Sequence, residues 1–262
     1  MSAYLSLTDW DVLSWPPEFI GLKNYVNLLT NDDTFLTVLR NTALYTVASV
    51  VATMLLSLLV ALAMNQSLRG IVVFRTAYYL PVVTSSVAVA VVWSWFYNPD
   101  FGPLNYYLSA IGVQPPVWLG SPDWSLWAVI LVAVWKSIGY QMILWLAGLQ
   151  GIPQHLYEAA SIDGAGRWRR FTGITLPLLT PTTFFVLVIS LINAFQVFDL
   201  VQVMTGGGPA DSSRTMVVYI YNTGFQFLKM GYAAAIAWSL FLIIFLITLV
   251  QWRLQARWVS YD

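Results

Sequence analysis

Long apolar stretches, each about the length that crosses a lipid bilayer, alternate with short polar connections along this chain. A transmembrane helix needs about 20 consecutive, mostly apolar residues. Five stretches meet this length: residues 41–64, 76–97, 124–149, 182–204 and 230–252. The pattern therefore predicts an all-α, polytopic membrane helix bundle with five spans, forming a single transmembrane domain over residues 1–262.

Composition supports a membrane protein and disfavours several kinds of site. Hydrophobic residues make up 58% of the chain and charged residues only 9%, against about a quarter in soluble domains. The chain contains no cysteine, and its single histidine is His155. Thiolate metal sites, iron–sulfur clusters and disulfides are therefore excluded, and a histidine-based metal site or a Ser-His triad is not expected. We predict a protein that is not an enzyme, with no metal and no cofactor bound in this chain.

The distribution of charge predicts the orientation of the spans. Cytoplasmic connections of membrane proteins carry an excess of Lys and Arg. One side of the predicted bundle holds Arg69, Arg75, Arg167, Arg169, Arg170, Arg253 and Arg257. The other side holds Lys23, Arg40, Arg214, Lys229 and eight acids: Asp9, Asp11, Glu18, Asp32, Asp33, Asp100, Asp123 and Asp211. The first side is predicted to be cytoplasmic, together with the C-terminus and the connection over residues 150–177.

This orientation places residues 1–40 outside the cytoplasm, ahead of an odd number of spans. The opening "MSAYLSLTDWD" has neither a basic region nor an apolar core, so it does not resemble a signal peptide. We therefore expect a further spanning helix upstream of Met1.

The connection over residues 150–177 contains "EAASIDGAG", a patch of small residues between two apolar spans. Pro153 suits the first position of a helix, and Gly164 can adopt the positive φ that ends one. A short helix from Pro153 to about Ile162, a turn at Gly164 and a second short helix through Trp168 are predicted. Because small side chains let another backbone approach closely, this loop is expected to be a docking surface.

The same loop resembles the EAA loop of permeases from binding-protein-dependent ABC importers. The pattern is Glu-Ala-Ala, three residues, Gly, nine residues, then Ile-x-Leu-Pro. In that family the loop is a coupling helix that sits in a groove of a cytoplasmic ATPase and transmits its motion. The resemblance implies that the coupling residues are Glu158, Ala159, Ala160, Asp163, Gly164, Ile174, Leu176 and Pro177.

Four further segments resemble the carbohydrate-uptake branch of this family, of the maltose and glycerol-3-phosphate type. They are "TDWDVLSWPPEFIGLKNYVNLL", "FRTAYYLPVVTSSVAVAVVWSWFYNPDFGPLN", "WLAGLQGIPQHLYEAASIDGAGRW" and "MTGGGPADSSRTMVVYIYNTGFQF". The resemblance implies the ABC importer permease fold and a place in the cytoplasmic (inner) membrane of a bacterium or archaeon. The implied partners are two ATPase subunits that bind ATP-Mg, a second permease, an extracytoplasmic solute-binding protein and a carbohydrate substrate. No nucleic acid is implied.

Polar residues inside the spans are candidates for a substrate pathway. In the fourth span, Ser190, Asn193 and Gln196 cover about 120° of a helix and are predicted to line a cavity. For each of them, hydrogen bonding between helices of the bundle remains an alternative.

The third span adds Lys136, Ser137 and Tyr140 to the predicted pathway. Hydroxyl and aromatic groups suit a sugar, which has polar hydroxyls and apolar ring faces. A structural or gating role is favoured for Lys136, and Asp199 is one conceivable counter-ion for it.

Other functions stay open at this point. An ABC permease for another small solute, such as an amino acid or a metal, has the same general pattern. An ion-coupled secondary transporter could use Lys136 and Asp199. A membrane-embedded enzyme is disfavoured, because the spans contain no histidine, cysteine or paired carboxylates.

Overall fold

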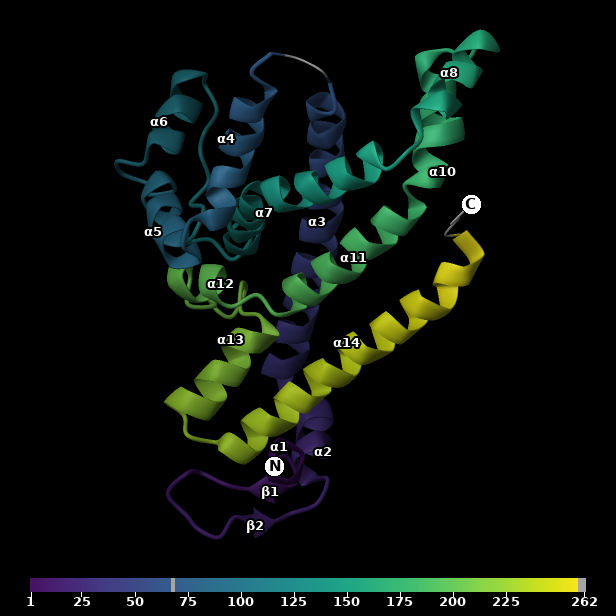
Figure 1. Ribbon diagram of the computed structural model, residues 1–262. Coiled ribbons are helices and arrows are strands. Elements are labelled where there is room, and N and C mark those ends of the chain that lie inside the picture. Colours follow the sequence, from purple (N-terminus) through teal and green to yellow (C-terminus); the bar gives the residue numbers. More distant parts are fainter. Residues whose placement is uncertain (67–68, 259–262) are drawn as a thin grey trace. The chain divides into compact units, whose positions relative to one another are not determined.

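The computed structural model describes residues 1–66 and 69–258, with the side chains of residues 256–258 left aside (Figure 1). The predicted cytoplasmic C-terminus, at residues 259–262, and the side chain of Arg257 lie outside the described residues. In chain order the elements are α1 Ser2–Leu5, β1 Thr8–Asp9, β2 Glu18–Phe19, α2 Lys23–Thr30, α3 Asp33–Met64, α4 Ile71–Val83, α5 Ser86–Phe96, α6 Pro103–Ala110, α7 Ser125–Gln150, α8 Gln154–Ile162, α9 Arg167–Arg170, the π-helix η1 Phe171–Thr175, α10 Leu176–Leu178, α11 Thr180–Phe195, α12 Asp199–Met204, α13 Met216–Tyr221, the π-helix η2 Asn222–Gln226 and α14 Met230–Trp258. The all-α prediction is confirmed, with one two-stranded antiparallel pair near the N-terminus.

The described residues contain four helices long and apolar enough to cross a membrane. They are Asp33–Met64, Ser125–Gln150, Thr180–Met204 and Met230–Gln255, and the pair α4 and α5 makes a fifth if it counts as one broken span. Many large apolar side chains on these helices are exposed, among them Leu55, Leu59 and Phe245. Such surface fits lipid, which solvates apolar side chains where water does not. The predicted number of spans is thus roughly confirmed.

The prediction of one continuous helix over residues 76–97 was wrong. Helix α4 ends at Val83, and Thr84 and Ser85 have extended backbones with ψ of 139° and 133°. The Thr84 hydroxyl donates to the Leu80 carbonyl at 3.0 Å, the acceptor that the amide of residue 84 would use in a continuing helix. Hydroxyl side chains compete with helical backbone bonding in this way. Pro81, near the end of α4, removes one further helical donor.

The fourth predicted span, residues 182–204, is also interrupted. Helix α11 ends at Phe195 and α12 begins at Asp199. Between them, the Val197 carbonyl accepts a hydrogen bond from the Thr215 hydroxyl at 3.2 Å. A distant part of the chain therefore satisfies a backbone group that a continuous helix would have satisfied itself.

Several helices extend beyond the predicted bounds of their spans, with α3 and α14 extending furthest. Helix α3 starts at Asp33 because Asp32 caps it: the Asp32 Oδ1 accepts from the Phe35 amide at 2.9 Å. Helix α14 continues past residue 252 to Trp258.

The chain divides into two compact units, and each is described by itself. The first unit comprises residues 1–49, 85–133 and 192–246, and the second comprises residues 50–84, 134–191 and the chain from Ile247 on. The buried core of the second unit lies where α3, α7 and α11 pack together. Its members are Ala61, Met142, Trp145, Leu146, Leu149, Ile152, Leu179 and Val186.

In the first unit, the N-terminal segment docks onto the start of α14. The side-chain Nδ2 of the buried Asn24 donates to the carbonyls of Ser6 and Thr8, both at 3.0 Å. These bonds fix the segment that leads into β1. The Gly231 amide donates to the Trp10 carbonyl at 3.1 Å. A Cβ on Gly231 would collide with the Thr8 carbonyl, so glycine permits this close approach.

Candidate functional site

The predicted helix–turn–helix in the connection between α7 and α11 is confirmed. Helix α8 ends at Ile162 with Asp163 as its C-cap, and Gly164 has the positive φ, 76°, that was predicted for the turn. The Gly164 amide donates to the Ser161 carbonyl at 3.1 Å, and the Ala165 amide to the Ala160 carbonyl at 2.8 Å. This is the Schellman pattern, which requires a left-handed residue at the turn and so favours glycine. The second short helix, α9, follows at once.

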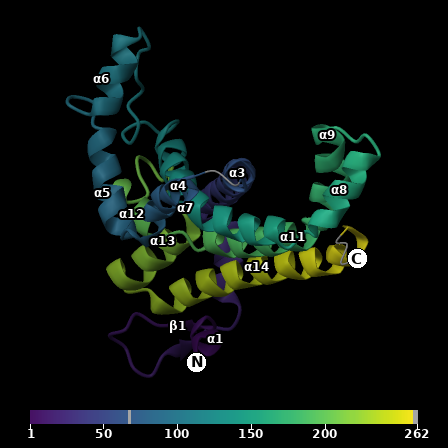
Figure 2. The same cartoon turned by 45° about the horizontal axis from the view of Figure 1, so that its top comes forward.

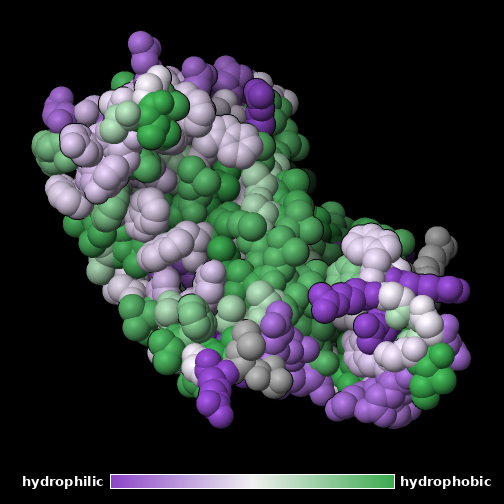
Figure 3. Space-filling view, turned by 90° about the horizontal axis from the view of Figure 1, so that it is seen from above, coloured by the Kyte–Doolittle hydropathy of each residue, from purple (hydrophilic) through white to green (hydrophobic). Residues whose placement is uncertain are grey.

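Most of the predicted coupling residues on α8 have exposed side chains. Glu158, Ala159 and Asp163 are exposed. The Glu158 carboxylate accepts a 2.9 Å hydrogen bond from the side-chain Nε2 of Gln154, one turn earlier. Ala160 is half-buried. In Figure 3, hydrophilic side chains gather over α8 and α9, beside an apolar surface. The exposed part of α8 therefore offers a carboxylate and a methyl-sized surface to an external partner.

The opposite side of α8 contacts the π-helix η1 and the core. The Tyr157 hydroxyl lies 2.9 Å from the Thr175 Oγ1, and Thr175 is buried. Tyr157 and Ile174 pack against the buried core of the second unit. The Arg170 guanidinium donates to the Ser161 hydroxyl at 2.8 Å, which holds α9 beside α8 (Figure 2). Helix α8 is therefore tied to η1, the segment that leads through α10 to α11.

The Ile-x-Leu-Pro part of the EAA pattern, residues 174–177, lies partly against the core and partly at the surface. Ile174 is half-buried, whereas Leu176 and Pro177 are exposed, Leu176 to 40%. These residues belong to a stretch in which η1 gives way to α10, so the backbone leading into α11 is not a regular α-helix.

Two exposed apolar residues in this loop were missed by the sequence-based prediction. Ile162 is 87% exposed and Trp168 is 76% exposed. Singly exposed apolar side chains are normal on protein surfaces, so the sequence carried no distinct signal for these two residues. Trp168 lies on α9 between Arg167 and Arg169, whose side chains are also exposed.

Lys136 lies where α7 packs against α4. Its Nζ donates to the Val82 carbonyl at 3.4 Å, in the last turn of α4. The carbonyl end of a helix carries partial negative charge, which favours a cation there. Three residues along α7, a Cβ on Gly139 would collide with the Tyr78 carbonyl, so the two helices are in close backbone contact. This geometry agrees with the structural role favoured for Lys136.

Ser190 takes part in a buried hydrogen-bond network inside the second unit. The Gln141 Nε2 donates to the Ser190 Oγ at 2.7 Å, and the Ser57 Oγ donates to the Gln141 Oε1 at 3.2 Å. The Trp145 Nε1 donates to Ser57 at 3.0 Å, which links α3, α7 and α11. Ser190 is only 7% exposed. The alternative of hydrogen bonding within the bundle therefore describes Ser190 in this structure, and its role in a pathway stays a prediction. Gln141 and Ser57 were not predicted.

The other predicted pathway residues keep accessible side chains. Asn193 and Gln196 are exposed, Tyr140 is 39% exposed and Ser137 is half-buried. Gln196 lies at the break between α11 and α12, where the backbone leaves the helix. The side chains of these four residues are not buried, and their role in a pathway stays a prediction.

A second polar cluster lies near the N-terminal end of α3. The Asp32 Oδ2 accepts hydrogen bonds from the hydroxyls of Tyr219, at 2.7 Å, and Tyr232, at 2.6 Å. Burial, together with the hydrogen bond to this carboxylate, raises the pKa of Tyr219. Through this carboxylate, the two phenols join α13 and α14 to α3.

Within residues 1–66 and 69–258, no three His, Asp or Glu side chains gather in a group able to hold a metal ion. His155 is exposed on α8. The polar groups described above either join helices to one another, lie at least partly exposed on or beside α7 and α11, or form the exposed surface of α8.

Comparison with known proteins places the chain in a family. Residues 53–260 match the family model described as "Binding-protein-dependent transport system inner membrane component". The chain is 38% identical over 265 residues to the probable ABC transporter permease protein YesP of Bacillus subtilis, covering 100% of this chain and 85% of that protein. It is 37% identical to the sn-glycerol-3-phosphate transport system permease protein UgpA of Agrobacterium fabrum, covering 98% of this chain and 88% of that protein.

A solved structure supports the same relationship. A chain of a bacterial alginate ABC transporter, crystallised in complex with an alginate pentasaccharide-bound periplasmic protein, has a TM-score of 0.83 and 30% identity. The match covers 91% of this chain and 83% of that chain. With the matched family model and the EAA pattern on the exposed helix α8, these likenesses lead to one conclusion: this chain belongs to the family of inner membrane components of binding-protein-dependent transport systems.

Proposed function

We propose that this chain is the membrane-spanning subunit of an ATP-driven importer for a sugar or related carbohydrate. The observation that carries the proposal is helix α8: it bears the EAA pattern, ends in a glycine turn and exposes Glu158 and Ala159. The carbohydrate class is supported by relatives whose names refer to sn-glycerol 3-phosphate and to alginate.

The proposed assembly contains two ATPase subunits that bind ATP-Mg, a second permease and an extracytoplasmic solute-binding protein. The ATPase would contact the exposed side of α8, on the cytoplasmic side that the arginine-rich connections indicate. The binding protein would deliver the carbohydrate to the opposite side, and the C-terminus would be cytoplasmic.

Coupling requires that a change in the ATPase favour one conformation of the permease. A partner with equal affinity for both conformations shifts nothing. In this chain the exposed part of α8 would receive the partner, with Glu158 and Asp163 as polar contacts and Ala159, Ala160 and Gly164 allowing close approach. The Tyr157–Thr175 hydrogen bond and the packing of Ile174 would carry the movement through Leu176 and Pro177 into α11.

The substrate pathway is proposed to pass the accessible polar residues of α7 and α11. Asn193 and Gln196 would bind sugar hydroxyls, and Tyr140 would offer an aromatic face beside Ser137. Lys136 and Ser190 would act by holding their helices in position, through the Val82 carbonyl and Gln141 respectively.

Reconstitution in vesicles tests the proposal. The chain would be assembled with its partner permease, ATPase and binding protein, and carbohydrate uptake and ATP hydrolysis would be measured together. We expect Glu158→Lys and Gly164→Val to lower uptake at least tenfold while hydrolysis continues. Gly166→Ala is the control, because a Cβ at Gly166 meets no neighbouring atom and its φ is −65°.

Full, coupled uptake by both Glu158→Lys and Gly164→Val would remove the coupling role of α8. Uptake that an ionophore abolishes and that persists without ATP would instead identify an ion-coupled transporter.

A further inference from the structure

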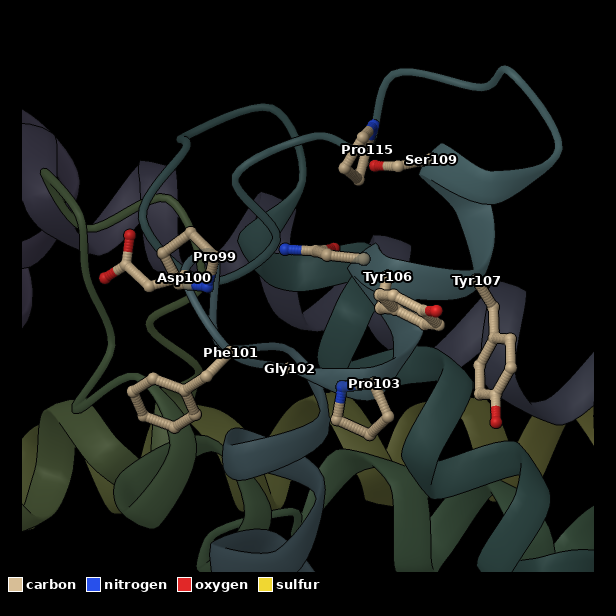
Figure 4. Close-up of a pocket in the computed structure, with 10 residues that line it drawn as sticks. Pro99, Asp100, Phe101, Gly102, Pro103, Tyr106, Tyr107, Ser109 and Pro115 are labelled. Atoms are coloured by element: carbon tan, nitrogen blue, oxygen red, sulfur yellow. The ribbon is translucent and has the colours of Figure 1, made fainter.

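The connection between α5 and α7 forms a hollow that the coupling mechanism does not use. Its volume is about 490 Å³, within the range of roughly 300–1,000 Å³ typical of small-molecule sites. Figure 4 shows Pro99 and Asp100 on one side of the hollow, Tyr106 on the other, and Ser109 with Pro115 at one end. All of its lining residues belong to the first unit.

The loop that forms the hollow is held by its own side chains. The Asn98 Oδ1 accepts from the amides of Asp100, at 2.9 Å, and Phe101, at 3.2 Å. The Asn105 Nδ2 donates to the Asn98 carbonyl at 3.1 Å, and the Trp118 Nε1 donates to the Asn105 Oδ1 at 2.8 Å. Asn105 and Trp118 are both buried. The side chains of Asn98 and Asn105 therefore maintain the shape of the loop before any ligand arrives. Such preorganisation lowers the entropic cost of binding.

Glycine is required at one point of this framework. A Cβ on Gly102 would collide with the carbonyls of Phe96 and Asn98. The backbone therefore folds tightly beneath the hollow, and α6 begins directly after this residue with Pro103.

The outward side of the loop carries aromatic rings. Phe101 is 64% exposed, Tyr106 is 72% exposed and Tyr107 is 68% exposed. The rings of Tyr106 and Tyr107 lie edge to face with centroids 5.5 Å apart. Aromatic faces pack against the apolar C–H faces of a pyranose ring, and phenolic, carboxylate and hydroxyl groups can bond its hydroxyls.

The charge of the lining limits the ligand further. Of the ten described residues that line the hollow, Asp100 is acidic and none is basic. The hydroxyls of a neutral saccharide can donate hydrogen bonds to this carboxylate, whereas the carboxylate would repel an acidic saccharide.

From this geometry, we propose that the connection between α5 and α7 is an extracytoplasmic binding site for a neutral, ring-containing saccharide, with Tyr106 and Tyr107 as its aromatic contacts and Asp100 as its acceptor. This inference rests on the proposed function, which brings a carbohydrate to this side of the membrane. A weak site at this position would hold sugar at the mouth of the transporter.

Ligand-observed saturation-transfer NMR tests the site on the assembled transporter in nanodiscs of neutral lipid, without binding protein or ATP. Maltotriose is the neutral ring-containing probe, and sn-glycerol 3-phosphate is the ringless one. We expect saturation of the maltotriose ring C–H protons and none of sn-glycerol 3-phosphate. Tyr106→Ala and Tyr107→Ala should each weaken maltotriose binding at least tenfold.

Phe227→Ala is the matched control, because Phe227 is an aromatic residue of similar exposure, 64%, that lies near the predicted extracytoplasmic Lys229 and outside the hollow. It should leave the signal unchanged. If the tyrosine variants do not assemble, Asp100→Asn replaces them: it should increase binding of alginate pentasaccharide at least threefold, and an unchanged signal would overturn the proposal.

No transfer to maltotriose in the parent protein, or equal transfer in both tyrosine variants, would also overturn it. So would variants that keep maltotriose binding and lose affinity for the solute-binding protein, since the loop would then be a protein-docking surface. These readouts need no ATP-driven step, so failure here leaves the coupling role of α8 untouched, and failure of coupled uptake is seen separately.

Discussion

Two connections of this molecule are built in opposite ways: the α8–α9 loop, which is predicted to be cytoplasmic, and the α12–α13 loop, which is predicted to be extracytoplasmic. In the α12–α13 loop, the carbonyls of Asp211 and Arg214 accept hydrogen bonds from the side-chain Nδ2 of Asn41, at 2.7 Å and 3.2 Å. The Met216 amide donates to the Thr42 hydroxyl at 2.9 Å, and Ser212 is hydrogen-bonded to Ser125 at 2.8 Å. Side chains from α3 and α7 thus fix this loop from several directions.

The α8–α9 loop, in contrast, is anchored on one side and exposed on the other. Tyr157 holds it to Thr175, while Glu158, Asp163 and Gly164 remain exposed. The difference teaches that one loop is fixed from several directions by the chain itself, whereas the other keeps an exposed surface, where we propose that the ATPase binds. Substitutions in the α12–α13 loop should therefore lower stability, and substitutions in the α8–α9 loop should change coupling.

The largest loss of stability is expected for Asn41→Ala. It removes two hydrogen bonds and leaves two backbone carbonyls without their donor, at a cost of about 2–4 kcal/mol. Thermal unfolding in detergent would measure the loss. Asn31→Ala is the control, because Asn31 is exposed. A change below about 0.5 kcal/mol for Asn41→Ala would show that the loop is not held from α3.

A smaller and more local effect is expected for Gly164→Ala. A side chain at φ 76° costs about 1–2 kcal/mol, although a Cβ there meets no neighbouring atom. Hydrogen exchange should speed up in the amides of α8 and leave those of α3 unchanged. Equal acceleration in both helices would contradict a loop that is independent of the rest of the structure.

Tyr157→Phe should have a still smaller effect on stability. It removes the hydroxyl that bonds Thr175, which is worth about 0.5–1.5 kcal/mol, and keeps the ring that packs on the core. If this bond transmits movement, uptake per ATP hydrolysed should fall more than thermal stability does. Thr172→Val is a control in the same segment, because the Thr172 hydroxyl bonds only its own helix turn, at the Trp168 carbonyl. An unchanged ratio of uptake to hydrolysis in Tyr157→Phe would assign the coupling to packing alone.

The smallest effect on stability is expected for Glu158→Gln. The side chain is exposed, and surface substitutions usually change stability by less than about 0.5 kcal/mol. Any loss of ATP-driven uptake would then come from the missing charge at the partner contact. A fall in the unfolding temperature that matches the fall in uptake would mean that Glu158 supports the fold instead.

Hydrophobic periodicity and short-range rules were sufficient for much of this protein. Apolar runs of bilayer length predicted the long helices α3, α7 and α14, because a segment in lipid must satisfy its own backbone bonds. The turn at Gly164 was also predictable, since a positive φ strongly favours glycine and the Schellman bonds are local.

Tertiary structure alone decided the features that depend on residues far apart in the chain. In the break after Phe195, Thr215 satisfies the carbonyl of Val197, and the buried Ser190 is bonded to Gln141 on a different helix. The exposure of Ile162 and Trp168, the Lys136–Val82 contact and the hollow in the connection between α5 and α7 also arise from packing. Local sequence sets which backbone conformations are allowed, but the partner of a polar group is chosen by whichever distant segment folds against it.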